Sequence, residues 1–347
     1  MAKKEGSEAN HRENERKLDR AKYTVITILV LSLVIFVAIA LLAIINEGVG
    51  RFFGTLSSIS PFYYSLALVC VLIGELLGFP KWELFIRKLG VRIDRLKNLE
   101  IYLSMFSMEI TPGRWGRAVV SYTLNRHTGV KFARTFPAVV ADIFTDFLGF
   151  VILALVSAFL VHTYALASLA IIALLLIPFI FIYVRGPFEW LKDLLGKHRS
   201  FDGFFEIGSA YFDSNKLLGG GTYAYAMVFT LPSMLMNGLA LYFVILSFGV
   251  PLSIGLLPTV LFVYTSAMLL GMVSGMPGAL GLADAAFLGY LVTYFGAADG
   301  VTLGVAAAIT IMFRVASIWF VEGVGSVFLV RTMRYWKSRK RVKLKRT

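Results

Sequence analysis

The sequence contains few charged residues and a single cysteine. Charged side chains make up 16% of its 347 residues, whereas a soluble domain has about 25%. One cysteine, Cys70, excludes an intrachain disulfide and therefore a disulfide-stabilised secreted scaffold. The shortage of charge together with 58% apolar residues also excludes an ordinary soluble enzyme and a disordered protein.

Several catalytic signatures are also missing. The sequence has no P-loop, no G-x-S-x-G nucleophile elbow and no D-D-x-x-D motif. Its four histidines lie in tails and connections without metal-ligand spacing: His11, His127, His162 and His198. We therefore expect no ATP-driven pump, no metal and no cofactor. The patterns identify no catalytic residue and favour a non-enzyme, but they leave a membrane-buried transferase open.

Long apolar runs dominate the rest of the sequence, and the mean hydropathy is +0.75. A transmembrane helix needs about 20 apolar residues. The runs predict an all-α, polytopic transmembrane helix bundle of about eight spans within residues 23–330, between basic tails 1–22 and 331–347. The expected spans are residues 23–45, 61–79, 136–161, 164–184, 222–248, 252–273, 283–296 and 303–330.

Basic residues concentrate in alternate connections between these runs. If both termini are cytoplasmic, 32 of the 34 Lys and Arg residues fall on the cytoplasmic side, with Arg51 outside and Arg314 within the membrane. This positive-inside distribution predicts a multi-pass cell-membrane protein with both tails in the cytoplasm. It also explains the net charge of +13 without nucleic acid, because basic tails are attracted to anionic headgroups.

Two Pro-Gly motifs interrupt the apolar pattern. P-G-x-x-G occurs twice, 165 residues apart, and Pro-Gly favours a turn over a helix. Because broken backbone at membrane depth must be buried or line a cavity, each motif is either a re-entrant element or a plain cytoplasmic turn. Interrupted helices in matching halves also suggest a duplicated transporter, although the span order places both motifs on the cytoplasmic side. The candidate hinge residues are Thr111, Pro112, Gly113, Gly116, Pro277, Gly278 and Gly281.

Acidic residues inside the apolar runs are candidate site residues, because such residues are rare in spans and usually face the interior. Asp142 and Asp146 are four residues apart and share one helix face. A cation, an arginine partner or proton coupling would each explain the pair. Asp284 begins the helix after the second motif, where a carboxylate also suits the helix dipole. Glu75 lies near the inner end of its predicted run and is expected to reach the interface.

Arginines are the candidate contacts of an anionic ligand. Arg314 lies near the middle of the last run, and it either pairs with an aspartate or binds a headgroup phosphate. Glu322 is also a substrate-binding candidate, although it lies about 80° around the helix from Arg314 and is a poor partner for it. Arg114 and Arg117 flank Gly116 and are candidates for binding a lipid phosphate. The alternative is that these two arginines only set the topology.

Four segments together resemble one family. They are ITPGRWGRAVVSYTLNRHTGV, the run with Asp142 and Asp146, MPGALGLADAAF and IMFRVASIWFVEGVG. Their order, over about residues 20–332, is similar to the lysylphosphatidylglycerol synthase transmembrane region. That family includes UPF0104-type membrane proteins and the flippase domain of the bacterial multiple peptide resistance factor. The resemblance implies a module that moves anionic or aminoacylated phospholipid between leaflets, with both Pro-Gly motifs, the three aspartates and Arg314 at its site.

The chain departs from the family pattern at three positions. Ala279 stands where a second glycine is expected, Asp284 where a glutamate is expected, and Ile143 where an arginine is expected after an acid. Because this arginine is missing, the chain is less strongly expected to bind headgroups as the family does. No aminoacyl-transferase domain follows the last run, so lysyl transfer is not expected of this polypeptide.

These observations predict a flippase-like translocator of anionic or modified phospholipid, or of a lipid-linked precursor, that is passive or ion-coupled. Arg314 would bind the phosphate, and the aspartates would line the cavity. One alternative is a membrane enzyme or accessory subunit acting on polyprenyl-linked sugars or lipids. Another is a scaffold with Gly271-x-x-x-Gly275 as its packing face. The expected partners are membrane lipids, either anionic phospholipid or polyprenyl-linked lipid. A second copy of the chain and a lipid-modifying enzyme remain open as protein partners.

Overall fold

The structure is a computed structural model in which every described regular element is a helix. It describes residues 48–161, 185–195, 216–251, 253–274, 277–296 and 300–344, and the separate positions 34, 37, 38, 41, 44, 45, 209 and 212. The expected span 164–184 and the tail 1–22 lie outside the described residues, and so does most of the expected span 23–45. The predicted tail 331–347 is described as far as Leu344.

Five described helices are long and apolar enough to cross a membrane. The continuous helix Leu303–Arg334 contains α13 (Leu303–Arg314), the π turn η7 (Val315–Trp319) and the start of α14 (Phe320–Leu344). The other four are α3 (Pro61–Lys88), α6 (Phe132–Val161), α10 (Gly219–Ser247) and the helix Ile254–Met272, which is largely α11 (Leu257–Ser274). The prediction of a helical membrane protein is confirmed, whereas a count of eight crossings is not.

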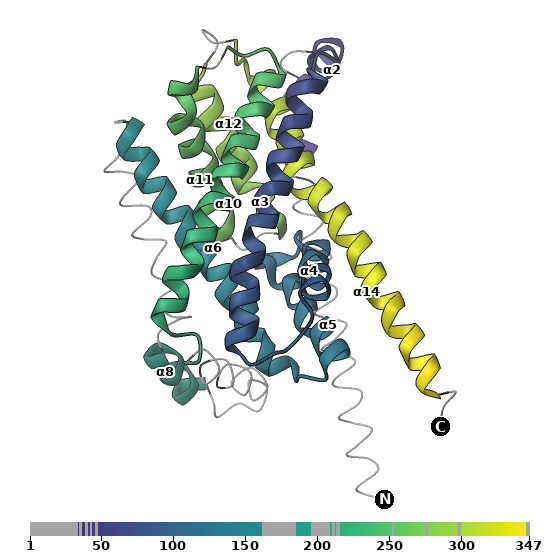
Figure 1. The fold of residues 1–347 in the computed structure, drawn as a ribbon. Helices are drawn as coiled ribbons and strands as arrows, with labels where there is room; N and C mark the ends of the chain where they lie inside the picture. Colours follow the sequence, from purple (N-terminus) through teal and green to yellow (C-terminus); the bar gives the residue numbers. More distant parts are fainter. Residues whose placement is uncertain are drawn as a thin grey trace, which may run out of the picture.

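Two helical hairpins lie between the long helices (Figure 1). The first hairpin is α4 (Arg95–Ser104), η1 (Met105–Met108), η2 (Pro112–Ala118) and α5 (Val119–Thr128). The second hairpin is α11, η5 (Pro277–Ala279) and α12 (Leu282–Tyr294). The hairpins occupy opposite halves of the molecule, and η2 packs against η5 between them. Both Pro-Gly motifs therefore form turns inside the molecule, as re-entrant elements require.

The second hairpin joins two of the predicted runs. Residues 252–273 and 283–296 correspond to its two arms, of which the first is long enough to cross a membrane and the second is shorter. Their connection includes Gly278, whose φ of 59° suits a residue without a side chain. The predicted span 61–79 is too short, because α3 continues through Pro80 and ends only at Lys88.

The two halves of the chain repeat the same order of elements in opposite directions. Each half has a long helix, a hairpin and another long helix. In Figure 1, α3 begins at the end of the molecule near α2 (Val49–Ser57), whereas α10 begins at the opposite end near α8 (Arg185–Leu195). The third residue of each P-G-x-x-G motif has a positive φ, 60° at Arg114 and 57° at Ala279, and no other described non-glycine residue does. The shared φ at this one position and the opposite directions of α3 and α10 support a duplication in inverted orientation.

The packing of α3 on α10 forms the centre of the bundle. Gly74 permits this close approach, because a Cβ there would lie 2.7 Å from Asn237 Nδ2 and 3.0 Å from the carbonyl oxygen of Ser233. Trp82, on the same buried side of α3, donates from its indole nitrogen to the Asn98 side chain at 3.1 Å. The interior face of α3 is thereby fixed against α10 and the first hairpin.

Candidate functional site: a neutral ion cluster beside the first hairpin turn

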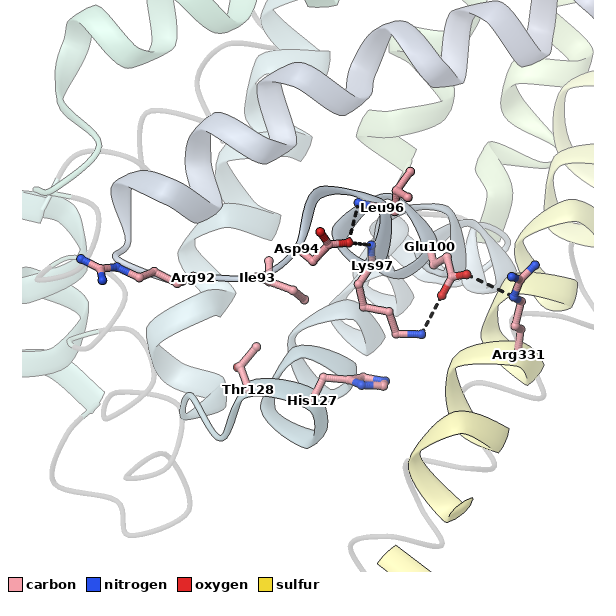
Figure 2. A pocket seen from close by; sticks show the side chains of 9 residues that line it. All are labelled: Arg92, Ile93, Asp94, Leu96, Lys97, Glu100, His127, Thr128 and Arg331. Atoms are coloured by element: carbon pink, nitrogen blue, oxygen red, sulfur yellow. Dashed lines mark hydrogen bonds and ion pairs between the residues drawn. The ribbon is translucent and has the colours of Figure 1, made fainter. Parts of the chain in front are cut away.

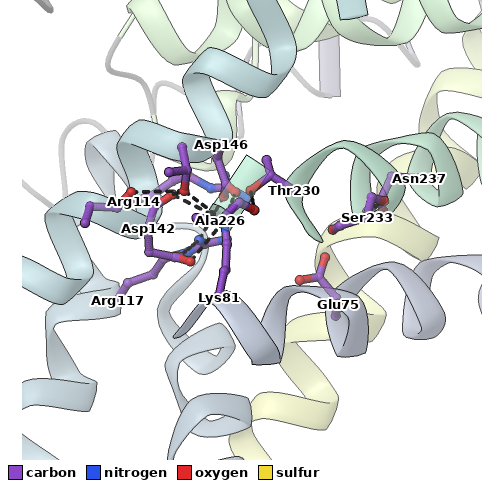
Figure 3. A network of polar contacts seen from close by, with 12 residues as sticks. Glu75, Lys81, Arg114, Arg117, Asp142, Asp146, Ala226, Thr230, Ser233 and Asn237 are labelled. Carbon is purple, nitrogen blue, oxygen red and sulfur yellow. Dashed lines mark hydrogen bonds and ion pairs between the residues drawn. The ribbon is translucent and has the colours of Figure 1, made fainter. Parts of the chain in front are cut away.

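Six charged side chains meet where α3, α6 and the first hairpin turn come together. Figure 3 labels all of them except Glu109. We call this set the ion cluster. Three members are basic and three are acidic, so the cluster has no net charge when all six are ionised. Its members are Lys81, Glu109, Arg114, Arg117, Asp142 and Asp146.

Lys81 connects α3 to the acidic face of α6. Its Nζ lies 3.1 Å from Asp142 Oδ1 and 2.5 Å from Asp146 Oδ1, and it also donates to Thr145 Oγ1 at 3.2 Å. The two aspartates lie on one face of α6, as their spacing predicts. Two carboxylates thus stabilise the buried lysine. These contacts are consistent with a helix that continues beyond Pro80.

Arg117 contacts all three acids of the cluster. Its Nε and Nη2 donate to the two carboxylate oxygens of Glu109 at 2.8 and 3.0 Å. Its Nη1 donates to Asp142 Oδ2 at 2.7 Å and to Asp146 Oδ2 at 3.1 Å. The guanidinium also lies over the ring of Phe106, 5.5 Å from its centroid. These contacts satisfy a guanidinium that is almost completely buried.

Arg114 and Asp146 form the exposed edge of the cluster. The side chain of Arg114 is 20% exposed and that of Asp146 is 15% exposed, and Arg114 Nη1 lies 3.1 Å from Asp146 Oδ2. Arg114 also pairs with Glu109. The φ of Arg114, 60°, is a sparsely populated conformation for a non-glycine residue. Such conformations persist where surrounding contacts hold them and often occur at functional sites.

Glu109 is the acidic residue of the turn itself. Burial would raise the pKa of its carboxyl group, but Arg114 and Arg117 outweigh that effect, so its pKa lies below the usual value. Glu109 is therefore ionised at neutral pH and holds both arginines of η2. Because the arginine pairs require this carboxylate, their contribution to stability is retained at neutral pH and is lost as the pH falls through the lowered pKa.

A separate buried ion pair holds the turn of the second hairpin. Arg314 Nε lies 2.5 Å from Asp284 Oδ1, and both side chains are 0% exposed. The other carboxylate oxygen of Asp284 accepts from the Gly281 nitrogen at 2.7 Å, and Arg314 Nη2 donates to the Ala279 carbonyl oxygen at 3.3 Å. The Arg314 guanidinium also lies over Phe287, 5.2 Å from the ring centroid. The predicted structural Arg–Asp pair is present, and its aspartate is Asp284.

The remaining predicted site residues take different positions. Glu322 is partly exposed on α14 and makes no ion pair with a described residue. In the first turn, Thr111 Oγ1 accepts from the Gly116 nitrogen at 2.6 Å and donates to the Met108 carbonyl oxygen at 2.8 Å. No described contact joins Arg314 to the aspartates of α6, so the two ion sites are separate in this structure.

The sequence interpretation missed two members of the cluster. Lys81 follows Pro80 and was assigned to a cytoplasmic connection, because proline often ends a helix. Glu109 is the single charged residue in the apolar segment 101–110. A lone carboxylate in an apolar segment beside a Pro-Gly motif is the signal that could have identified it.

A surface pocket lies where α4, α5 and α14 meet (Figure 2). Glu100 connects two of its basic residues, with Lys97 Nζ at 2.6 Å and Arg331 Nε at 3.1 Å from its carboxylate. The lining residues are Arg92, Ile93, Asp94, Leu96, Lys97, Glu100, His127, Thr128 and Arg331. No predicted site residue lines this pocket, so we distinguish it from the ion cluster.

Long apolar helices, inverted hairpins and internal ion sites define a multi-pass helical membrane protein with polar groups between its helices. Among the residues that the structure describes, no group of His, Cys, Asp and Glu side chains is arranged to hold a metal ion. The chain belongs to the family described as the lysylphosphatidylglycerol synthase TM region, which matches residues 29–325. The family predicted from the sequence motifs is thus confirmed.

A curated relative gives a more limited likeness. A UPF0104 membrane protein of Methanothermobacter thermautotrophicus is 28% identical over 138 residues. The match covers 40% of this chain and 34% of the relative, so it extends over about a third of that relative's length. The relative's name states a membrane protein and no activity.

Proposed function

We propose that this protein moves lipids with charged headgroups between the leaflets of the cell membrane, and that the headgroup binds at the exposed edge of the ion cluster. One observation carries the proposal. The cluster is neutral and largely buried, and its exposed edge consists of one cation, Arg114, and one anion, Asp146. A polar path for a headgroup avoids the cost of several kcal/mol, roughly, for each unpaired polar group in hydrocarbon.

The chemistry of the edge favours a headgroup with two charged groups. The Arg114 guanidinium offers planar donors that suit a phosphate. The Asp146 carboxylate suits an ammonium group. Aminoacylated phospholipids contain both groups, and the family name refers to one of them, lysylphosphatidylglycerol. This supports aminoacylated and anionic phospholipids as the proposed lipid class.

Arg314 has a different part in the proposal. It has no exposed surface and contacts Asp284, the Ala279 carbonyl oxygen, the Met268 sulfur and the Phe287 ring. Its predicted contact with a headgroup therefore requires the pair with Asp284 to open. We propose that the main role of Arg314 is to stabilise the second hairpin turn. Its role in headgroup binding stays a prediction.

The proposed orientation follows the distribution of basic residues. The end of the molecule where α3 ends and α10 begins would face the cytoplasm, because the connections at that end are rich in lysine and arginine. In this orientation the first hairpin enters from the cytoplasmic side and the second from the opposite side. The two turns meet between the faces, as the inverted repeats of transporters do.

Lipid exchange in proteoliposomes tests the proposal. With headgroup-labelled phosphatidylglycerol, the wild type should exchange label between leaflets. A hydrogen bond to a charged group contributes about 1.5–3 kcal/mol, so Arg114→Ala should slow exchange about 10- to 100-fold. Arg87→Ala, at an exposed arginine of α3 that pairs with Glu83, should exchange like the wild type.

Two outcomes contradict the proposal. One is that folded wild type exchanges neither anionic, zwitterionic nor aminoacylated phospholipid. The other is that Arg114→Ala exchanges as fast as Arg87→Ala. The first outcome would favour the alternative of an enzyme or subunit acting on polyprenyl-linked lipids, which turnover of such a lipid would then test.

A further inference from the structure

Glu75 is an acidic residue at the middle of a transmembrane helix. It is the fifteenth of the 28 residues of α3, which is long and apolar enough to cross the membrane. The expectation that Glu75 reaches the interface therefore does not hold, because the helix continues for more than three further turns. A carboxyl group at such a position is rare and usually functional.

Glu75 faces the interior of the protein. It lies on the helical stripe that contains Val71, Gly78 and Trp82, all of which are buried. By contrast, Ile73 belongs to the outward stripe and is exposed. In Figure 3 the Glu75 side chain points into the space between α3 and α10 and not away from the bundle. Glu75 as a whole residue is partly buried.

The Glu75 carboxylate has no hydrogen bond or ion pair with any described residue. The Tyr102 hydroxyl donates to the Glu75 backbone carbonyl at 2.8 Å and not to the side chain. Titratable groups on four neighbouring elements interact electrostatically with it. They are Glu109, Arg114 and Arg117 of the first hairpin turn, Asp146 of α6, Tyr102 of α4 and Tyr264 of α11. The uncharged Ser233 and Asn237 of α10 lie on the side toward which the Glu75 side chain points (Figure 3).

The charge balance of the ion cluster leaves no cation for Glu75. Lys81 and the two arginines are already matched by three carboxylates at 3.1 Å or less. An ionised Glu75 would add one unmatched negative charge at membrane depth, which is costly. A bound proton removes that charge and leaves every pair of the cluster intact.

We propose that Glu75 is a proton-binding site, and that proton uptake and release there couple lipid movement to a proton gradient. Proton binding stands on the geometry alone, whereas the coupling rests on the proposed function. When Glu75 releases its proton to water, its negative charge attracts Arg114 and competes with a headgroup phosphate. When Glu75 is protonated, this competition ends and Arg114 is available to the phosphate.

Infrared difference spectroscopy tests proton binding without any transport assay. The reconstituted wild type should show a protonated-carboxyl band that titrates with pH. Glu75→Gln, which keeps the size and polarity of the side chain, should lose this band. Glu189→Gln, at a partly exposed glutamate of α8 that pairs with Arg185, should keep it. A wild type without such a band, or a band that survives in Glu75→Gln, overturns the proposal.

Transport under a pH gradient tests the coupling. Vesicles of phosphatidylcholine and phosphatidylglycerol with headgroup-labelled phosphatidylglycerol should show an exchange rate that depends on the gradient. Glu75→Gln should still exchange lipid but lose this dependence, and Glu189→Gln should retain it. A sodium gradient that replaces the pH gradient, or a gradient dependence that persists in Glu75→Gln, overturns the coupling. If the wild type exchanges no lipid, the proposed function and the coupling both fail, and the infrared band still decides whether Glu75 binds a proton.

Discussion

At the scale of single residues, Arg117 makes the most extensive contacts in the ion cluster, because it alone touches all three acids. Removing one partner of a buried ion pair costs about 3–5 kcal/mol. We therefore expect Arg117→Ala to lower the free energy of unfolding by about this amount, and Arg117→Lys to lower it less. Thermal unfolding in detergent measures both. An unchanged melting temperature in Arg117→Ala would show that the cluster does not stabilise the fold.

The pair of Arg314 and Asp284 allows structural and transport roles to be separated. Asp284→Leu should destabilise the protein by about 3–5 kcal/mol, because it leaves a buried guanidinium without an anion. Arg314→Met combined with Asp284→Leu should restore most of that stability, since replacing both charges by apolar groups is often neutral. If the double variant is stable and still exchanges lipid at the wild-type rate, the predicted headgroup role of Arg314 is wrong.

The sequence predicted part of the site residue by residue. Asp142 and Asp146 could be predicted because two acids in one apolar helix require compensation. The partner Lys81 could not, since hydropathy assigns a lysine after a proline to a connection. Nor does local sequence show which aspartate pairs with Arg314, because that contact joins residues 30 apart on different helices.

At the scale of elements, the first hairpin turn depends on the small size of Gly116. A Cβ at this position would lie 2.6 Å from the Met108 carbonyl oxygen, so backbone would have to move. We expect Gly116→Ala to destabilise the protein by about 1–3 kcal/mol and to slow lipid exchange. Gly289→Ala in α12, where no atom lies within 4 Å of the added Cβ, is the matched control. Equal unfolding temperatures for the two variants would refute the importance of this turn.

The second hairpin shows which properties of a helix can be predicted from hydropathy. The apolar composition correctly predicted that α11 and α12 are apolar helices. It gives no information about how deeply each helix enters the membrane. The Pro-Gly motifs gave the re-entrant alternative, because Pro-Gly favours a turn. The packing of η2 on η5, a contact between segments 165 residues apart, supports the re-entrant alternative, and hydropathy does not predict such a contact.

At the scale of the whole molecule, the proposed orientation predicts which connections reach each side. Ser58 and Arg92 are exposed near opposite ends of α3. In a Cys70→Ser background, Ser58→Cys should react with a membrane-impermeant maleimide in intact cells. Arg92→Cys should react only after the membrane is opened. The reverse pattern would place both predicted cytoplasmic tails outside.

The two turns have a positive φ at the same motif position but use opposite charges. In the first half, the hairpin supplies arginines to acids on the following long helix. In the second half, the hairpin supplies an acid to an arginine on the following long helix. An exchange of segments between the halves would therefore bring like charges together, arginines against Arg314 and Asp284 against the aspartates of α6. We therefore expect each hairpin to pair more favourably with its own helix than with the corresponding helix of the other half.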